Sequence, residues 1–450
     1  MTPAPFISAL TAPLFGDAEA EAMLSDASFV GHMITVEAAF ARACAAVGLV
    51  TPADAEEISA CLAQISIAPE QLGAGTASAG VPVPALVALL QDACPSAARG
   101  VHWGATSQDI VDAAHVLQWR ELLDLLARRL SSLLDTMQAA SDAEAATMLA
   151  GRTRSQIATP ITLGLRIATW AQPLIVLEEE LPRLSGRLLR VQFGGASGAG
   201  SAVGTRAEAL SLALARELEL VAAPCWHLDR SGPQALGGWL VRLTSALGKL
   251  ARDLIITGRS EIAEMRAGAG GGSSTMPQKS NPVAAEALVT LAHYTAALQP
   301  LLAQASMIQE ERDGAAWALE WLALPQMGMA ASASLRHAAI LIESLRPDRE
   351  RMRAQLHAGE GAIMAEAASF ALAHHMTRSE AAARVKRALS TARAAGKSLA
   401  EVMAADPELA ALEDWARCLG ADQARPACEA MRGRIWRARA PDAAVSDTGK

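Results

Sequence analysis

The sequence has 450 residues, of which 51% are hydrophobic and only 4% aromatic, and its formal net charge is −8. This length and composition predict a globular protein with a large core, and the negative charge argues against a general nucleic-acid binder, which needs a basic surface to neutralise phosphates. Alanine and leucine recur throughout with few β-branched runs, which favours an all-α fold.

The cysteines and the amino-terminal stretch indicate the compartment. The first Lys or Arg is Arg42, so the start of the chain lacks the basic region of a signal peptide, and we expect a cytoplasmic protein. No CxxC pair is present, which fits neither a zinc site nor a disulfide-rich secreted scaffold. We therefore expect reduced, mostly buried thiols at Cys44, Cys61, Cys94, Cys225, Cys418 and Cys428.

The hydrophobic spacing divides the chain into three helical regions. Residues 1–105 contain shorter helical stretches broken by Pro and Gly, such as residues 28–49, where Met33, Val36 and Phe40 keep near-helical spacing. Residues 106–348 are expected to form a central bundle of long helices, and residues 349–450 a smaller helical region. The long helices are predicted at 106–140, 158–190, 233–267 and 283–305.

Residues 287–309 form a charge-free span that is long enough to suggest a transmembrane helix. Polar residues and a proline interrupt this span, among them His293, Gln299 and Pro300. A helix buried in the core of a water-soluble bundle is therefore the better interpretation.

The first stretch that could carry chemistry is HWGATSQD, which begins at His102 and leads into the long helix. Thr106 and Asp109 match a loose capping box, so simple helix capping is one interpretation. The other is an anion site, because the free backbone amides at a helix amino terminus, together with Thr106, Ser107 and Gln108, favour a carboxylate.

The second stretch, GRTRSQ, begins at Gly151 and supplies Arg152, Thr153, Arg154 and Gln156 just before a predicted helix that contains Pro160 near its start. The two arginines can be ordinary surface charges. Their planar guanidinium groups also suit carboxylates, so a substrate with several carboxylates would use such a site.

Two further stretches, WHLDRS from Trp226 and QEERDGAAWALEW from Gln309, contain charged residues in an apolar setting. Taken singly, each of these residues fits a structural role better than a catalytic one, and Trp317 with Trp321 is typical of a core stripe on a helix. The candidates are His227, Arg230, Glu311, Arg312 and Glu320.

A glycine-rich segment, AGAGGGSSTMPQKSNPV, covers residues 267–283. It lacks the Gly-Lys-Ser/Thr order of a phosphate-binding loop, because Lys279 follows Gln278. A mobile lid is a better interpretation, since glycines permit large backbone changes, while Pro277 and Pro282 stiffen the far end. A flexible surface linker would explain the glycines but not the polar residues that follow them.

From Gly272 to Pro282 the segment matches the fumarase/aspartase superfamily signature GSSxMPxKxNP without a gap. The other stretches occur in the same order as in that superfamily, and HWGATSQD, WHLDRS and GAAWALEW most resemble the bacterial 3-carboxy-cis,cis-muconate cycloisomerases, which are lactonizing enzymes of protocatechuate breakdown. The resemblance implies a homotetramer with a shared central bundle and active sites built from three chains. It also implies a reaction without a metal or an organic cofactor.

The resemblance also assigns roles to individual residues. Ser273 corresponds to the catalytic serine, and Lys279 and Asn281 to the residues that hold the activated carboxylate of the substrate. The resemblance also places His102, Thr106, Ser107 and Gln156 in the polycarboxylate-binding pocket. From their own chemistry we expect further pocket residues at Gln108, Arg152, Thr153, Arg154 and Arg312.

Two positions depart from the superfamily pattern. Many of its lyases have Thr-His where this chain has Thr153 and Arg154. An amine or hydroxide leaving group needs an acid, whereas a carboxylate, whose acid has a pKa of about 4, does not. The substitution thus favours a carboxylate that adds to, or leaves from, a double bond. Glu310 replaces a histidine common in related cycloisomerases, which leaves the role of residues 309–312 open.

Two alternatives to a cycloisomerase remain: an eliminase of the adenylosuccinate lyase type and a non-catalytic structural relative.

Overall fold

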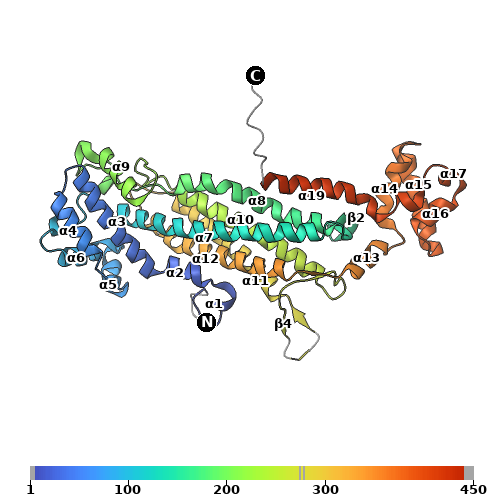
Figure 1. Ribbon diagram of the computed structural model, residues 1–450, viewed down its shortest axis with the longest axis horizontal. Helices are drawn as coiled ribbons and strands as arrows, with labels where there is room; N and C mark the ends of the chain where they lie inside the picture. Colours follow the sequence, from blue (N-terminus) through green and yellow to red (C-terminus); the bar gives the residue numbers. More distant parts are fainter. Residues whose placement is uncertain (1–5, 273–274, 277–278, 440–450) are drawn as a thin grey trace, which may run out of the picture. The chain divides into compact units, whose positions relative to one another are not determined.

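The computed structural model describes residues 6–272, 275–276 and 279–439, and within these ranges helices dominate (Figure 1). The all-α expectation is confirmed. The chain forms two compact units. The first unit comprises Met1–Leu130, Leu177–Ser245 and Ala287–Arg336, and the second comprises Ser131–Val176, Ala246–Glu286 and His337–Lys450. The three regions expected from the sequence remain a prediction about domain organisation.

In the part of the chain that the structure describes, five long helices contribute residues to both units. Helix α11 has the predicted bounds and continues through Pro300. Helix α7 begins one residue after the predicted start, and α10 ends ten residues before the predicted end. The long helices are α7 (Ser107–Ala143), α8 (Leu163–Leu188), α10 (Ser231–Thr257), α11 (Val283–Ala305) and α12 (Gly314–Glu343).

The shorter helices follow local capping signals. Thr51 caps α4 by accepting a hydrogen bond from the backbone N–H of Asp54 at 3.1 Å, with Pro52 at the first helical position. The shorter helices of the first unit are α1 (Ala12–Phe15), α2 (Ala18–Leu24), α3 (Asp26–Ala46), α4 (Pro52–Leu62), α5 (Glu70–Ala79), α6 (Val83–Ala93) and α9 (Ala207–Leu218). Those of the second are α13 (Arg349–His357), α14 (Ala365–Leu372), α15 (Arg378–Ala395), α16 (Leu399–Ala405), α17 (Pro407–Ala410), α18 (Trp415–Cys418) and α19 (Arg425–Arg439).

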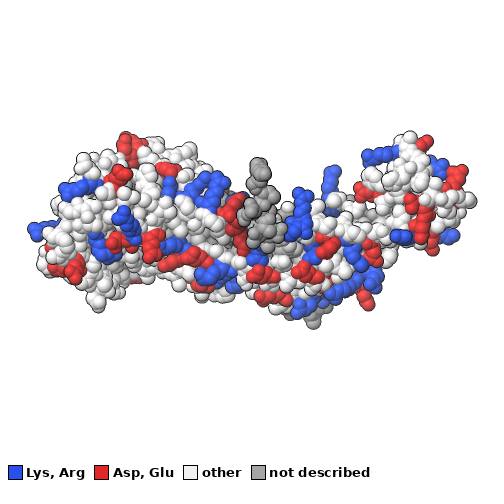
Figure 2. Space-filling view, turned by 45° about the horizontal axis from the view of Figure 1, so that its top comes forward, with Lys and Arg blue, Asp and Glu red and all other residues white. Residues whose placement is uncertain are grey.

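The surface mixes both signs of charge. Figure 2 shows Lys and Arg interspersed with Asp and Glu over the face in view. Some of these charges pair across elements, as where Arg42 of α3 donates to Glu217 of α9 at 2.6 Å. Such exposed pairs contribute little to stability.

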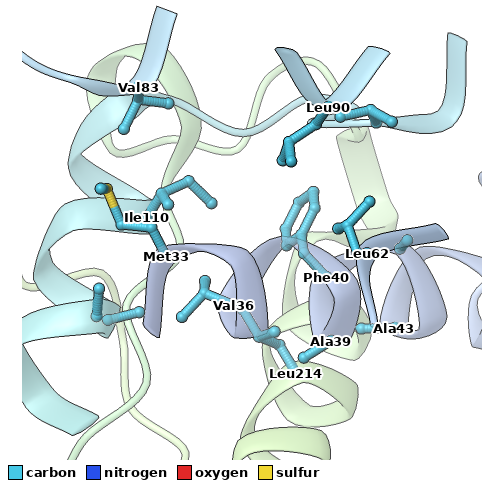
Figure 3. Close-up of a cluster of buried hydrophobic side chains, with 14 of the residues drawn as sticks. Met33, Val36, Ala39, Phe40, Ala43, Leu62, Val83, Leu90, Ile110 and Leu214 are labelled. Carbon is cyan, nitrogen blue, oxygen red and sulfur yellow. The ribbon is translucent and has the colours of Figure 1, made fainter. Parts of the chain in front are cut away.

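The core of the first unit lies where α3 packs against α4 and α9. Met33, Val36 and Phe40, whose spacing predicted a helix, all lie on the buried face of α3 (Figure 3). They meet Leu62 of α4 and Leu214 of α9 in one hydrophobic cluster. This cluster fixes α3 beside the start of α7, where the candidate site residues begin.

The second unit has its own hydrophobic cluster, which includes Leu372, Val385 and Trp415. Its helices α15 and α16 begin at capping boxes, at Thr377 with Glu380 and at Ser398 with Glu401. Ala150 also belongs to this cluster.

Among the described residues, the strands form three short antiparallel pairs: β1 (Met148–Thr153) with β2 (Gln156–Thr162), β3 (Met265–Arg266) with β6 (Arg346–Pro347), and β4 (Gly271–Gly272) with β5 (Ser280–Asn281). The prediction that a helix begins at residue 158 was wrong, because residues 158–162 belong to β2. Pro160 was taken as a helix-starting residue, but it pairs with Ala150 in a two-stranded sheet, where a residue without an N–H is tolerated.

Helix α11 covers most of the apolar span 287–309 and buries one face, which includes Ala287, Leu288 and Leu291. This agrees with the expectation of a helix that contributes to the core of the bundle. In the part of the chain that the structure describes, no helix is both long and apolar enough to cross a membrane. All six cysteines are free thiols, with Cys44, Cys94 and Cys428 buried and the others half-buried.

Candidate active site

The start of α7 is anchored by the buried carboxylate of Asp109. Its Oδ2 accepts from the backbone N–H of Thr106 at 3.0 Å, which is one half of the expected capping box. The same carboxylate accepts from the N–H groups of Gly194 at 2.8 Å and Gly195 at 3.0 Å, and its Oδ1 lies 2.9 Å from Nε2 of His227. With four partners, Asp109 ties two distant segments to the helix start.

His227 is held as a cation by this contact. Burial lowers the pKa of His227, but the hydrogen bond and the negative charge of Asp109, together with the neighbouring Cys225, outweigh it and raise the pKa to about 9. The WHLDRS histidine therefore forms a buried ion pair at neutral pH. Through this contact it supports the helix start.

A second buried carboxylate, Asp112, lies one turn further along α7. Arg230 donates to it from Nη1 at 2.8 Å and Nη2 at 3.0 Å, and Trp317 donates from Nε1 at 3.0 Å. Arg230 also donates from Nε to Glu320 at 2.9 Å, and its guanidinium lies over the Trp226 ring, 4.8 Å from the ring centre. The candidates from WHLDRS and GAAWALEW thus meet in one charged network beneath α7.

The charges of this network are unequal. Burial raises the pKa of the Asp112 carboxyl, but the Arg230 guanidinium outweighs burial and holds that pKa below its usual value. Burial raises the pKa of Glu320 despite the same guanidinium. One cation is therefore shared between two buried carboxyl groups, of which Asp112 is the more firmly ionised.

Gln108 and Arg312 are brought together at the helix start. Arg312 donates from Nε to Oε1 of Gln108 at 3.1 Å and from Nη2 to the carbonyl of Ala196 at 3.1 Å. Gln108 is buried, while Thr106 and Ser107 beside it are half-buried. The positive end of α7, two hydroxyls and a guanidinium thus form a place suited to an anion. Glu310 and Glu311, in the same loop as Arg312, are exposed.

His102 lies just before this helix start and has a partner that the sequence did not reveal. Its Nδ1 is 2.6 Å from Oε1 of Glu37, a buried residue of α3. Burial lowers the pKa of His102, but the charge and hydrogen bond of Glu37, helped by Asp109, outweigh it and raise that pKa. One sequence signal could have found Glu37, namely a carboxylate one residue after Val36 on the apolar face of a predicted helix.

In the second unit, the GRTRSQ stretch is the turn of the β1–β2 hairpin. Arg154 and Ser155 form the two-residue connection and have positive φ angles of 49° and 65°. Such mirror-image turns strongly favour Asn-Gly, because most residues with a Cβ are strained at positive φ, whereas Gly has no Cβ and Asn tolerates this region. The turn presents Arg154 as an exposed side chain, flanked by the exposed Thr153 and Gln156, which pair with each other across the hairpin.

Arg152, the other arginine of this stretch, forms an ion pair with a buried carboxylate. Its Nη1 and Nη2 each donate to a carboxylate oxygen of the fully buried Glu264 at 2.7 Å. This bidentate pair occupies the fork of the guanidinium. Direct binding of a substrate by Arg152 stays a prediction, whereas its contact with Glu264 braces the hairpin that carries Arg154.

The glycine-rich segment forms the β4–β5 hairpin, in which Gly271 pairs with Asn281 and Gly272 with Ser280. Gly270 has a φ of 72°, in the left-handed region that favours glycine, and a Cβ there would meet Oγ of Ser280. Lys279 is exposed at the end of the connection, and Asn281 is half-buried. Ser273, together with Ser274, Pro277 and Gln278, lies outside the described residues. The role of Ser273 and the lid motion stay predictions.

The candidates thus fall into two groups. The first unit carries His102, Thr106, Ser107, Gln108 and Arg312 around the start of α7, and the second carries Arg152, Thr153, Arg154, Gln156, Lys279 and Asn281 on two hairpins. Among the residues that the structure describes, no group of three or more His, Cys, Asp or Glu side chains is arranged to hold a metal ion. Both groups are rich in donors, which suits a ligand with several carboxylates.

Comparison with known proteins identifies relatives over nearly the whole chain. A family model described as Lyase matches residues 11–294. A 3-carboxy-cis,cis-muconate cycloisomerase from Bradyrhizobium diazoefficiens is 37% identical over 90% of this chain and 92% of its own length, and a nitrosuccinate lyase from Streptomyces davaonensis is 32% identical over 89% and 88%. The crystal structure of the 3-carboxy-cis,cis-muconate lactonizing enzyme from Pseudomonas putida superposes with a TM-score of 0.89, at 32% identity, over 96% of this chain and 99% of that one.

Proposed function

The chain belongs to this lyase family, and from that premise we propose that it is a cycloisomerase that converts 3-carboxy-cis,cis-muconate to a carboxymuconolactone. The likeness to relatives named for this activity extends over 82–90% of the chain, and the fold agrees with that of a lactonizing enzyme. Within the family, the observation that best supports this activity over an elimination is the arginine at the tip of the β1–β2 turn, Arg154.

The reaction adds one carboxylate of the substrate to its own carbon–carbon double bond. A carboxylate oxygen forms a bond to one alkene carbon, and the π electrons move onto the neighbouring carboxylate as an enediolate. A proton then reaches the α carbon, so the product is an isomer of the substrate. The nucleophile is already ionised at neutral pH and needs no base. The energetic problem is the extra charge of the enediolate, which requires donors fixed in advance.

Arg154 fits this reaction better than it fits an amine or hydroxide elimination. A guanidinium stays protonated and cannot serve as the acid that a poor leaving group needs. It does bind carboxylates well, and the proposed substrate has one more of them than muconate. The strained turn residues Arg154 and Ser155 indicate that an arginine is kept there at a cost to local stability. We assign Arg154 to the additional carboxylate.

The remaining roles follow from the donors on each element. Lys279 and Asn281 would stabilise the enediolate, because a cation and an amide donor are the groups that developing negative charge requires. His102, Thr106, Ser107 and the amides at the start of α7 would receive another carboxylate. Ser273 would deliver the proton to the α carbon, and its oxyanion would need the charge of Lys279 nearby.

We also propose that the chain assembles as a homotetramer that completes each active site from several chains. In support, the long helices and the loop after α11 expose large apolar side chains, which protein interfaces commonly cover. These side chains are Val176 on α8, Ile256 on α10, Met307 after α11, and Leu322 and Ile340 on α12. Sedimentation velocity at several concentrations tests this, and a stable monomer at micromolar concentration would contradict it.

The activity is tested by the loss of diene absorbance when purified protein meets 3-carboxy-cis,cis-muconate in the presence of EDTA. We expect turnover, and we expect NMR of the product to show a lactone. Unchanged absorbance together with turnover of adenylosuccinate would replace the assignment with the eliminase alternative. No turnover of any unsaturated diacid or triacid in a panel would favour the non-catalytic relative.

A further inference from the structure

Glu37 lies on the face of α3 that builds the hydrophobic core of the first unit. Its neighbours along this face, Met33, Val36 and Phe40, are buried apolar residues, and the Glu37 side chain is only 1% exposed. A carboxylate in such a place is costly unless it is paired, because burial removes its hydration. Its Oε1 has a partner in His102, whereas its Oε2 is buried and has no hydrogen-bond partner among the described residues. The hydrogen bond to His102 is therefore the contact that accounts for a carboxylate at this buried position.

His102 is held in an unusual backbone conformation. Its φ is 59°, in the left-handed region, and Gly104 two residues later also has a positive φ, of 77°. This corner ends directly before α7 and is further held by Cys44 of α3, whose Sγ lies 3.9 Å from the carbonyl oxygen of Trp103. Strained residues of this kind persist only where the surroundings determine them, and they cluster at functional sites. The contact with Glu37 fixes the ring that the strained corner presents.

The hydrogen bond to Glu37 leaves one ring nitrogen for a ligand. Nδ1 of His102 is engaged at 2.6 Å, while Nε2 has no partner within the described part of the chain, and 18% of the side chain remains exposed. A ring bonded through Nδ1 to a carboxylate is fixed in orientation and, when doubly protonated, offers Nε2–H as a charged donor. Both acidic groups that act on this ring, Glu37 from α3 and Asp109 from α7, favour the charged form.

We propose that Glu37 is a positioning residue that holds His102 through Nδ1, so that Nε2–H is oriented to bind a carboxylate of the substrate. The proposal rests on the proposed function for the identity of that substrate. Glu37 itself is buried in the core and acts only through His102. The same pair explains why an acidic residue interrupts the apolar face of α3.

The test uses the full-length protein and the variant Glu37→Gln, which keeps the size and shape of the side chain but removes its charge. Hydrogen–deuterium exchange at the imidazole C2 position of His102, followed by mass spectrometry across pH, reports the protonation midpoint without any need for activity. We expect the midpoint to fall in Glu37→Gln. In the absorbance assay we expect KM to rise about tenfold with a smaller change in kcat, because a charge-assisted hydrogen bond becomes a neutral one. The alkaline limb of kcat/KM should move to lower pH.

Glu217→Gln is the matched control, because Glu217 also accepts a 2.6 Å hydrogen bond from a basic residue of α3, Arg42, but on the surface. It should leave both the midpoint of His102 and the kinetics unchanged. Glu37→Asp keeps the charge and should restore most of the raised midpoint. If Glu37→Gln folds, an unchanged protonation midpoint of His102 and an unchanged KM would overturn the inference. If Glu37→Gln does not fold, the wild-type protein decides: a His102 midpoint at or below the ordinary value of about 6.5 would overturn the inference. Absence of turnover by the wild-type protein would instead overturn the proposed function.

Discussion

The start of α7 and the two hairpins of the second unit carry candidate residues in opposite settings. At the start of α7, Gln108 is buried, and the acidic residues Asp109 and Asp112 below it are saturated with partners. On the hairpins, Arg154 and Lys279 are exposed on short connections between strands. The first group is fixed by a buried network and the second by backbone geometry.

This difference separates residues that contribute mainly to the stability of the fold from residues that contribute mainly to catalysis. Removing one charge of the buried network leaves its partners unpaired in the interior, which is costly to stability whether or not the residue touches a substrate. Exposed charges on turns contribute little to folding, so an arginine or lysine there needs another reason. Substitutions in the two regions should therefore have effects of different kinds.

The largest effect is expected for Arg230→Met, which removes the cation shared by Asp112 and Glu320. Two buried carboxyl groups then lack their partner, and we expect a loss of about 3–5 kcal/mol in the free energy of unfolding. Without the guanidinium, burial should raise both carboxyl pKa values above their unfolded values. The folded variant then binds more protons than its unfolded state, so its stability should fall as pH rises and improve toward pH 5. Urea unfolding at several pH values measures this.

Arg190→Met provides a matched control, since Arg190 also lies over the Trp226 ring but pairs with the half-exposed Asp229 on the surface. We expect it to cost about 1 kcal/mol or less. Equal losses in the two variants, or a loss in Arg230→Met that does not depend on pH, would show that the buried network does not share one cation between two carboxyl groups.

The next effect in size is expected for Lys279→Met, and it should appear in turnover instead of stability. If Lys279 stabilises the enediolate, its removal should lower kcat by about 10²–10³-fold, while the exposed hairpin loses no buried contact and the unfolding midpoint stays the same. Lys249→Met removes another exposed lysine, which pairs with Asp253 within α10, and it should leave kcat unchanged. A Lys279→Met protein with wild-type kcat would exclude this lysine from the mechanism.

The sequence predicted the helices well where one local signal dominates. Residues 283–305 form α11 as expected, since the apolar spacing is sustained and Pro282 precedes its first residue. The β1–β2 hairpin was missed because its turn, Arg154-Ser155, is not a sequence that forms such turns by preference, and because Pro160 fits both a helix start and an edge strand. Local propensity is weakest where a functional residue occupies a strained position.

The candidate site was predicted in part for a related reason. Signature residues such as Lys279 and Asn281 are recognisable because their spacing is fixed within one segment. Partners such as Glu37 for His102 and Glu264 for Arg152 are 65 and 112 residues away from them in the chain, so only the fold brings them together. A lone buried carboxylate in a helix gives no indication of which distant cation it meets.

The smallest effect is expected at the β1–β2 turn, where the comparison between buried and exposed groups can be made most sharply. Arg154→Asn places a residue that tolerates the left-handed conformation at a φ of 49°, so we expect the variant to gain about 0.5–1 kcal/mol in stability. It should also lose about tenfold in kcat/KM for 3-carboxy-cis,cis-muconate and almost nothing for cis,cis-muconate, because only the former has the additional carboxylate. Ser155→Gly relieves the neighbouring strain at a φ of 65° and should gain stability without a change in selectivity. Equal losses toward both substrates in Arg154→Asn would mean that the arginine supports the hairpin in general, since a residue that recognises one carboxylate must discriminate between substrates that differ only in that group.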